Sequence, residues 1–335
     1  MKRRNFIRTV AGSGAGLLGL GAGLGIAMPA SAQGSSMDLA RIITGFAAGG
    51  TSDAVCRRLA VRLTGDYAKS VVVENRTGAG GQIAIQALKG LAADGSWILQ
   101  TPMSMLGIYP HIYKQLRYDG LKDVTPVSLA CTFDFGFAVG PSVPDSVKTV
   151  PQFLAWAKQD QTRAAFGSPA AGSVPHFIGV LLGRSANVDM RHIAYRGTQP
   201  AILDMIGGQI PAVSGPVGDF LPHLATGKCR ILATSGSTRT KFTPTVATLR
   251  EQGLKDMVFS EWFGIFLPPG AEAAVVTRLH AALKPALASQ DVVSGLAGFG
   301  LEAASSTPAE LASRLREDHE RWGQVVRTIG FTADS

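Results

Sequence analysis

The stretch VVVENRTGAGG at residues 71–81 decides the fold of this chain. Its valines indicate a buried strand, and its glycines open a turn before a helical pattern at 82–92. The same order occurs earlier, where RIITGF at 41–46 leads through two glycines to a helical pattern at 52–64. WILQT at 97–101 indicates the next strand. Strands that alternate with helices predict an α/β fold with a mostly parallel sheet and helices on both faces.

Two helical patterns carry further local signals. The pattern at 307–330 begins with Thr307 as N-cap and has Glu310 three residues later, which predicts a capping box. The pattern at 52–64 places apolar residues along one helix face, at Val55, Leu59 and Leu63. Both segments are therefore predicted to be amphipathic helices that pack against a core.

A second series of strands and helices follows the first, and a long extended stretch borders it on each side, at 128–150 and at 258–270. We interpret these stretches as crossovers between two α/β lobes. Lobe 1 is expected to comprise 37–137 and 259–335, and lobe 2 to comprise 138–258. The strands expected in the second series lie at 163–168, 190–195, 210–215 and 229–236.

The first residues read as an export signal. MKRRNFIRTV is basic, the following run is rich in glycine and apolar residues, and PASAQ supplies small residues for cleavage, so residues 1–32 are predicted to be a signal peptide cut before Gln33. The pair Arg3-Arg4 resembles a twin-arginine signal, although Lys2 precedes it. The chain is therefore expected in the periplasm. An uncleaved N-terminal anchor is the alternative.

Charge and cysteine content exclude some classes of function. The formal net charge is +8, but residues 1–32 hold four basic residues and no acidic ones, so the remainder has a net charge of +4. Nucleic-acid binding is therefore not expected. Cys56, Cys131 and Cys229 form no metal-binding motif, and buried free thiols are favoured over one disulfide with a leftover thiol. No metal and no cofactor are expected.

The glycine-rich loops do not match nucleotide-binding motifs. From Gly78 the chain reads GAGGQI, with Ile83 where a dinucleotide fingerprint needs glycine. Gly227-Lys228 precedes a cysteine, which excludes a phosphate-binding Walker loop. Each loop is compatible with a simple capped turn. Several such loops at the carboxyl edge of one sheet would instead favour a ligand site that can hold a carboxylate.

A hydrolase is a weak alternative. In GSPAAGSVPH at 167–176, Ser173 would be the nucleophile and His176 its base, but the sequence offers no orienting acid and no nucleophile elbow. His176 is more typical of a helix start that satisfies a local hydrogen bond. Arg196, at the end of an expected strand, fits either a ligand clamp or an ordinary surface arginine.

Taken together, these motifs closely resemble the substrate-binding proteins of tripartite tricarboxylate transporters, the Bug family. The resemblance covers nearly the whole chain after the signal. Its motifs appear here as AAGGTSD at 47–53, VVVENRTGAGG at 71–81, DGSWIL at 94–99, GSVPH at 172–176, YRGTQPAILDMIGGQ at 195–209, TGKCRILA at 226–233 and WFG at 262–264.

The resemblance implies a periplasmic binding protein fold of type II, with two α/β lobes, two crossover strands and a ligand cleft between the lobes. It implies a monomeric receptor without catalytic activity. Such a receptor captures a small carboxylate or amino-acid-like ligand, closes by hinge motion and delivers the ligand to membrane transporter subunits. A ligand-loaded sensor partner of a signalling receptor is the alternative.

Several positions depart from the family pattern at its ligand end. Ala47 and Ala48 replace prolines, Tyr109 replaces an amide-bearing residue, and the loop before Asp219 is unusual, although Asp219 could reach inward. The identity of the ligand therefore stays open.

The loops expected to converge on the cleft supply the candidate site. Gly49, Gly50, Ser168 and Ser173 are expected to contact a ligand carboxylate. Asp53 fits a ligand amine or a favourable charge at a helix N-terminus equally well, and Trp262 fits a cleft wall or the core. The full set of candidate ligand-binding residues is Ala48, Gly49, Gly50, Thr51, Asp53, Thr101, Ser104, Ser168, Gly172, Ser173, His176, Tyr195, Arg196, Gly197, Asp219 and Trp262.

Overall fold

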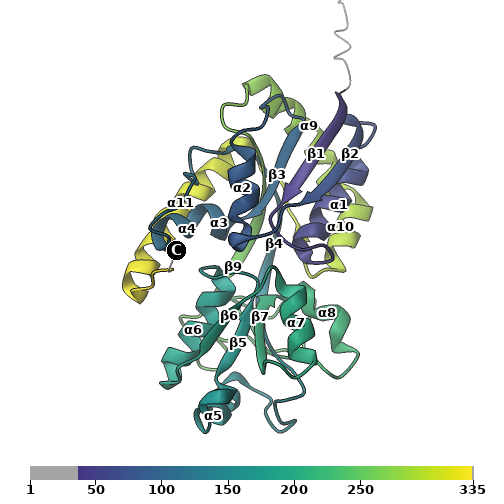
Figure 1. Ribbon diagram of the computed structural model, residues 1–335. Helices are drawn as coiled ribbons and strands as arrows, with labels where there is room; N and C mark the ends of the chain where they lie inside the picture. Colours follow the sequence, from purple (N-terminus) through teal and green to yellow (C-terminus); the bar gives the residue numbers. More distant parts are fainter. Residues whose placement is uncertain (1–36, 334–335) are drawn as a thin grey trace, which may run out of the picture. The chain divides into compact units, whose positions relative to one another are not determined.

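Two long antiparallel strands, β4 (Thr125–Val139) and β9 (Ser260–Leu267), connect two α/β regions of the protein (Figure 1). The computed structural model describes residues 37–333, so the predicted signal peptide lies outside the described residues. The strand order is β2-β1-β3-β9-β4-β7-β5-β6, and β8 and β10 also pair with β4.

The first region contains three parallel strands and the helices that follow them. β1 (Met37–Thr44) lies between β2 (Ala68–Asn75) and β3 (Trp97–Pro102), and both of these pair with it in parallel. The helices of this region are α1 (Thr51–Leu63), α2 (Gln82–Leu88), α3 (Met103–Gly107), α4 (Tyr109–Ile112), α9 (Ala273–Ala288), α10 (Gln290–Ala297) and α11 (Pro308–Ile329). A short strand, β10 (Glu302–Ala303), pairs with the middle of β4.

The second region repeats the arrangement. β5 (Ala165–Ser168) lies between β6 (Arg191–Ala194) and β7 (Ala212–Pro216), again in parallel. β8 (Arg230–Thr234) and β7 pair antiparallel with the end of β4. The helices of this region are α5 (Val150–Lys158), α6 (Val174–Ala186), α7 (Thr198–Ile206) and α8 (Val217–Leu224).

The sheet is mixed, which differs from the mostly parallel sheet predicted from the sequence. The βα units are parallel as expected, but β4 and β9 run antiparallel to each other and to their other neighbours, β3 and β7. The reason is that each connecting strand passes from one region into the other, and the two strands pass in opposite directions.

Local predictions for the helices are confirmed. Val55, Leu59 and Leu63 of α1 are fully buried. Thr307 accepts a hydrogen bond from the backbone N–H of Glu310, and the Glu310 side chain accepts one from the backbone N–H of Thr307, which completes the capping box of α11. α11 contacts α3, α4 and β4 along its buried face.

The glycines of VVVENRTGAGG allow the loop after β2 to lie against the loop after β1. β2 ends at Asn75, and after a tight turn α2 begins at Gln82. Gly78, Gly80 and Gly81 all have positive φ. A Cβ atom on Gly45 would lie 2.6 Å from the Cα atom of Gly81, so the loop after β1 packs directly on the loop after β2. This approach needs residues without side chains.

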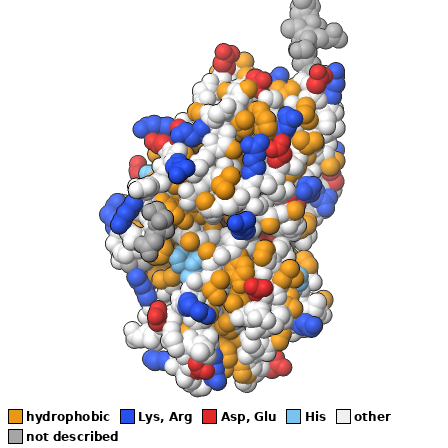
Figure 2. Space-filling view, in the orientation of Figure 1, with side chains coloured by type: hydrophobic (Ala, Val, Ile, Leu, Met, Phe, Trp, Pro, Cys, Tyr) orange, Lys and Arg blue, Asp and Glu red, His pale blue; other side chains and the backbone are white. Residues whose placement is uncertain are grey.

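The three cysteines are buried and free, as the sequence favoured. Burial raises the pKa of the Cys229 thiol to about 12. Within residues 37–333, no helix is long and apolar enough to cross a membrane. On the face shown in Figure 2, acidic and basic side chains are interspersed.

Candidate ligand-binding site

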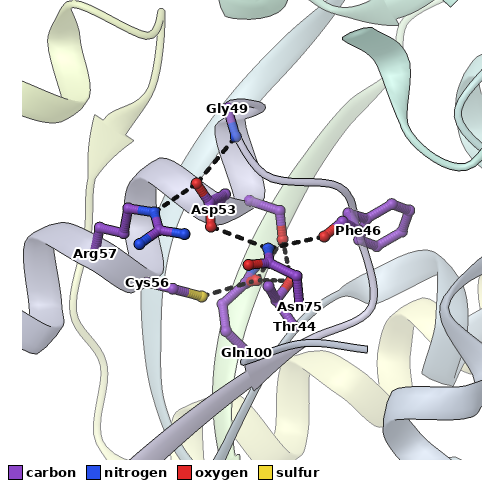
Figure 3. Close-up of polar contacts among 9 residues, drawn as sticks. Thr44, Phe46, Gly49, Asp53, Cys56, Arg57, Asn75 and Gln100 are labelled. Carbon is purple, nitrogen blue, oxygen red and sulfur yellow. Dashed lines mark hydrogen bonds and ion pairs between the residues drawn. The ribbon is translucent and has the colours of Figure 1, made fainter. Parts of the chain in front are cut away.

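A network of hydrogen bonds fixes the loop between β1 and α1 (Figure 3). The Asn75 side-chain amide donates to the Phe46 carbonyl oxygen and to Asp53 Oδ1, each at 3.0 Å. Asp53 Oδ2 accepts from the Gly49 backbone N–H at 3.0 Å and from Arg57 Nε at 2.7 Å. Asn75, the asparagine of ENRTGAGG, therefore holds the loop in place.

A second polar cluster lies beneath the same loop. Thr44 Oγ1 donates to Gln100 Oε1 at 3.0 Å and lies 2.7 Å from Ser52 Oγ, and the Ser52 hydroxyl donates to the same Gln100 oxygen. Cys56 Sγ also donates to it, at 3.6 Å. These contacts tie the carboxyl ends of β1 and β3 to the first turn of α1.

The fixed loop forms one wall of a cavity of about 50 Å³ between the two regions. A buried water needs about 10–15 Å³ measured in this way, so the cavity has room for a few waters or a small solute. The residues that line it are Phe46, Ala47, Gly50, Thr51, Ser52, Pro102, Ser104, Met105, Phe133, Phe135, Pro169, Ala170, Ser173, Pro175, Gly197, Thr198, Gln199, Pro216, Asp219, Glu261 and Phe263.

Asp219 joins the two regions at this cavity. It lies in the first turn of α8, and its Oδ1 accepts a 2.8 Å hydrogen bond from the backbone N–H of Thr51, the first residue of α1. Burial raises the pKa of Asp219 to about 6, and hydrogen bonds from Thr198, Thr51 and Gln199 act in the opposite direction. An acid at the start of α1 also complements the positive end of the helix dipole.

Glu261 is a second buried acid in the lining. Its Oε1 accepts from the backbone N–H of Ser104 at 2.7 Å and from the Ser104 hydroxyl. The backbone N–H of Val174, at the start of α6, donates to Ser104 Oγ at 3.5 Å, so this contact also crosses between the regions. Burial raises the pKa of Glu261 to about 7, and the nearby Asp318 adds to the effect.

A cavity between two α/β regions is the geometry of a solute receptor, and the comparisons with known proteins agree. Residues 55–331 match the model of the tripartite tricarboxylate transporter family receptor. The chain belongs to this family. Protein BugT of Bordetella pertussis is 30% identical over 307 residues, which cover 91% of this chain and 94% of BugT. The family predicted from the motifs is thereby confirmed.

Solved structures share the fold. MatC from Rhodopseudomonas palustris with bound malate is 26% identical, with a TM-score of 0.79, and the match covers 86% of this chain and 99% of MatC. An R. palustris protein with adipate is 25% identical, with a TM-score of 0.83, and the match covers 88% of this chain and 98% of the other. The predicted α/β periplasmic binding protein fold is confirmed. Members of the family are receptors rather than enzymes, and so is this chain.

The structure of this receptor brings part of the predicted site together. The predicted residues that line the cavity are Gly50, Thr51, Ser104, Ser173, Gly197 and Asp219. Ala48, Gly49 and Asp53 line a separate, more open hollow with Arg57 and Arg58. The hydrogen bonds of the loop hold Asp53 in the first turn of α1. This is the position of a favourable charge at a helix N-terminus, one of the two roles expected for Asp53.

The remaining predicted residues lie outside the cavity lining. Trp262 is only 1% exposed, and its indole N–H donates to Asp318 Oδ2 at 2.7 Å. The Tyr195 hydroxyl donates to Asp204 Oδ2, and Arg196 is exposed. The others that the cavity lining does not include are Thr101, Ser168, Gly172 and His176.

Ser173 and His176 have separate hydrogen-bond partners. Ser173 Oγ donates to the Ala170 carbonyl oxygen at 2.8 Å, and His176 Nδ1 accepts from the Gly172 backbone N–H at 2.9 Å. His176 thus makes the local hydrogen bond expected of a helix-start residue. The arrangement needed for a serine nucleophile with an adjacent base does not occur at this pair.

Sequence reasoning missed Glu261 and the aromatic part of the lining. Glu261 is a lone charge within an otherwise apolar strand, and that anomaly was the available signal. Phe133, Phe135 and Phe137 alternate along β4, but alternation alone does not say which ring meets a cavity. Phe137, the third of them, packs instead against Phe153.

Proposed function

We propose that this protein is an exported receptor that captures a small carboxylate or amino-acid-like ligand in the cavity between its two regions. It then delivers the ligand to the membrane subunits of a tripartite tricarboxylate-type transporter. The observation that carries the proposal is the cavity itself, which is lined by strand ends and helix starts from both regions. The family match supports the transporter as partner, and the malate and adipate bound by relatives support a small organic acid or a similar solute.

Capture would proceed by closure of two lobes, 37–137 with 259–335 and 138–258, about β4 and β9. The contacts that cross the cavity, Thr51 to Asp219 and Val174 to Ser104, would form on closure and break on opening. A ligand held between the lobes stabilises the closed arrangement, because it binds that state in preference. The periplasm is the proposed location of this receptor, and the export signal expected from the sequence supports it.

Native mass spectrometry of the purified protein tests the proposal, since a bound solute stabilises a receptor and is often retained. A small carboxylate or amino acid released in a one-to-one ratio is the expected result. Ala47→Trp, which places an indole in the cavity, should abolish retention. Ala48→Trp is the matched control, because the neighbouring Ala48 is exposed and does not line this cavity. A released nucleotide or organic cofactor, or equal retention in both variants, would contradict the proposal.

A further inference from the structure

Among the residues that the structure describes, the cavity lining includes acidic side chains and no basic ones. Asp219 and Glu261 enter it from different elements, α8 and β9, and each is 3% exposed. No lysine, arginine or histidine is among the lining residues. The ion pairs of residues 37–333 all involve other acids. The outer surface in Figure 2 shows interspersed charge of both signs, so the one-sided cavity is a distinct feature.

Aromatic rings complete the lining. Phe46 follows β1, Phe133 and Phe135 belong to β4, and Phe263 belongs to β9. The ring centroids of Phe133 and Phe263 are 4.5 Å apart at an interplanar angle of 63°, and those of Phe133 and Phe135 are 5.5 Å apart at 71°. Phenylalanine faces attract cations, most strongly where water is excluded.

Two backbone donors in the cavity lining are already occupied by these acids. The N–H of Thr51 donates to Asp219, and the N–H of Ser104 donates to Glu261. A dicarboxylate would therefore meet two acids of the protein without a cation to balance them. In a poorly solvated cavity, such like charges repel strongly.

We propose that this receptor selects a small solute with an ammonium-type cation, held between the carboxylates of Asp219 and Glu261 and the phenylalanine rings. The proposal rests on the receptor function above and narrows its ligand to the amine-bearing class. An ammonium group supplies the missing positive charge, donates hydrogen bonds to the carboxylate oxygens and contacts the ring faces.

The proposal has a consequence for pH. Ionised Asp219 and Glu261 attract the cation, so its affinity should rise as pH increases from 5 to 8, since their pKa values are raised to about 6 and about 7. The charged group that acts on Glu261 from α11 is Asp318. The groups that act on Asp219 from α1 and α7 are neutral: Thr51, Thr198 and Gln199.

Isothermal titration with three four-carbon probes tests the idea. Succinate, 4-aminobutanoate and 1,4-diaminobutane have similar length and exchange carboxylate for ammonium step by step. We expect the ammonium-bearing probes to bind at pH 8 about tenfold or more tightly than succinate. Asp219→Asn and Glu261→Gln should each weaken ammonium binding about tenfold or more. Glu302→Gln, which removes an exposed acid outside the cavity, is the matched control and should leave it unchanged.

The outcomes separate this inference from the receptor proposal. Binding of succinate without binding of either ammonium-bearing probe would overturn the inference and leave the receptor function standing. Ammonium binding that both cavity variants retain unchanged would also overturn it. A thermal-shift assay tests further candidate ligands: the common amino acids, choline, malate and adipate. If folded protein binds none of these compounds, the receptor proposal fails, and the inference fails with it.

Discussion

The backbone N–H of Thr51 donates a 2.8 Å hydrogen bond to the Asp219 carboxylate, which lies 168 residues later in the chain. This bond connects the start of α1 in the first region with the start of α8 in the second. Both partners are buried. The bond therefore fastens the two regions together at the wall of the cavity, and it places a carboxylate of the protein at a helix start that a ligand could otherwise occupy.

Replacements at Asp219 should separate hydrogen bonding from charge. Asp219→Asn retains an acceptor for the Thr51 N–H, whereas Asp219→Ala leaves that buried donor without a partner. We expect the alanine variant to be less stable than the asparagine variant by about 1–3 kcal/mol at pH 7.5. Urea denaturation measures the difference. Equal stability of the two variants would show that the Thr51 bond contributes nothing to the fold.

Glu261 should make stability depend on pH. Its pKa rises from 4.5 unfolded to about 7 folded, so the folded state retains a proton that the unfolded state releases. The stabilisation is fully present below pH 4.5 and is lost as pH rises through 7, for a total of about 3 kcal/mol. As pH rises from 4.5 to 8, the Glu261→Gln variant should therefore become more stable relative to the unmodified protein. Denaturation at pH 4.5 and 8 measures the change, with Glu302→Gln as the control for loss of an exposed charge.

Titration of the stacked histidines, His176 and His192, should make the protein less stable as pH falls, which is the opposite of the effect of Glu261. Their ring centroids are 3.8 Å apart, and burial lowers the pKa of His176 to about 4 and that of His192 to about 3, with His176 adding to the effect on His192. The stability that these neutral rings contribute is complete above pH 6.5 and is lost as pH falls through the folded pKa values. At pH 5, each ring should lower the free energy of unfolding by about 2 kcal/mol.

His192→Gln tests the histidine prediction, because it removes one titrating ring. The variant should lose less stability than the unmodified protein between pH 7.5 and pH 5, by about 2 kcal/mol. Parallel stability curves for the two proteins would contradict it.

Gly218 permits a close backbone contact between the two regions. A Cβ atom at this position would lie 1.4 Å from the Phe299 carbonyl oxygen. Gly218→Ala should force α8 away from the loop after α10, lower the stability by about 1–3 kcal/mol and weaken ligand binding. Gly90→Ala is the matched control, since its Cβ atom would meet nothing within 4 Å. Thermal unfolding with and without ligand measures both effects, and equal behaviour of the two variants would refute the explanation.

Export is testable at the N-terminus. The mature protein from periplasmic extracts should begin at Gln33, and replacement of Arg3 and Arg4 by lysine should retain the precursor in the cytoplasm. N-terminal sequencing and fractionation measure these outcomes. A periplasmic protein that still begins at Met1 would favour the anchor instead.

Much of the fold could be predicted because its signals are local. The spacing of Val55, Leu59 and Leu63 reflects the helical repeat, and the capping box of α11 involves residues three positions apart. Both depend on chain neighbours, whatever the rest of the molecule does. The antiparallel pairing of β4 and β9 was not evident from the sequence. The direction of a strand in a sheet depends on which region of the molecule the strand leaves and which it enters.

The candidate site was predictable in part for the same reason. Glycine-rich loops and helix starts can be recognised in the sequence. Gly50, Thr51 and Ser173 lie in such loops and helix starts, and they line the cavity. Trp262 shows no such signal: its neighbours allow it to face either the cavity or the core, and its bond to Asp318 on α11 places it in the core.

The sequence by itself determined the longer helices it marked, most strands, the receptor family and the loops from which a site could be built. Only the tertiary structure decided that Asp219 and Glu261 enter one cavity, that phenylalanines line it, and that its lining within residues 37–333 includes no basic residue. The physical reason is that the position and charge state of these acids depend on contacts between distant segments. Burial sets their pKa values, and burial exists only after the two regions have packed together.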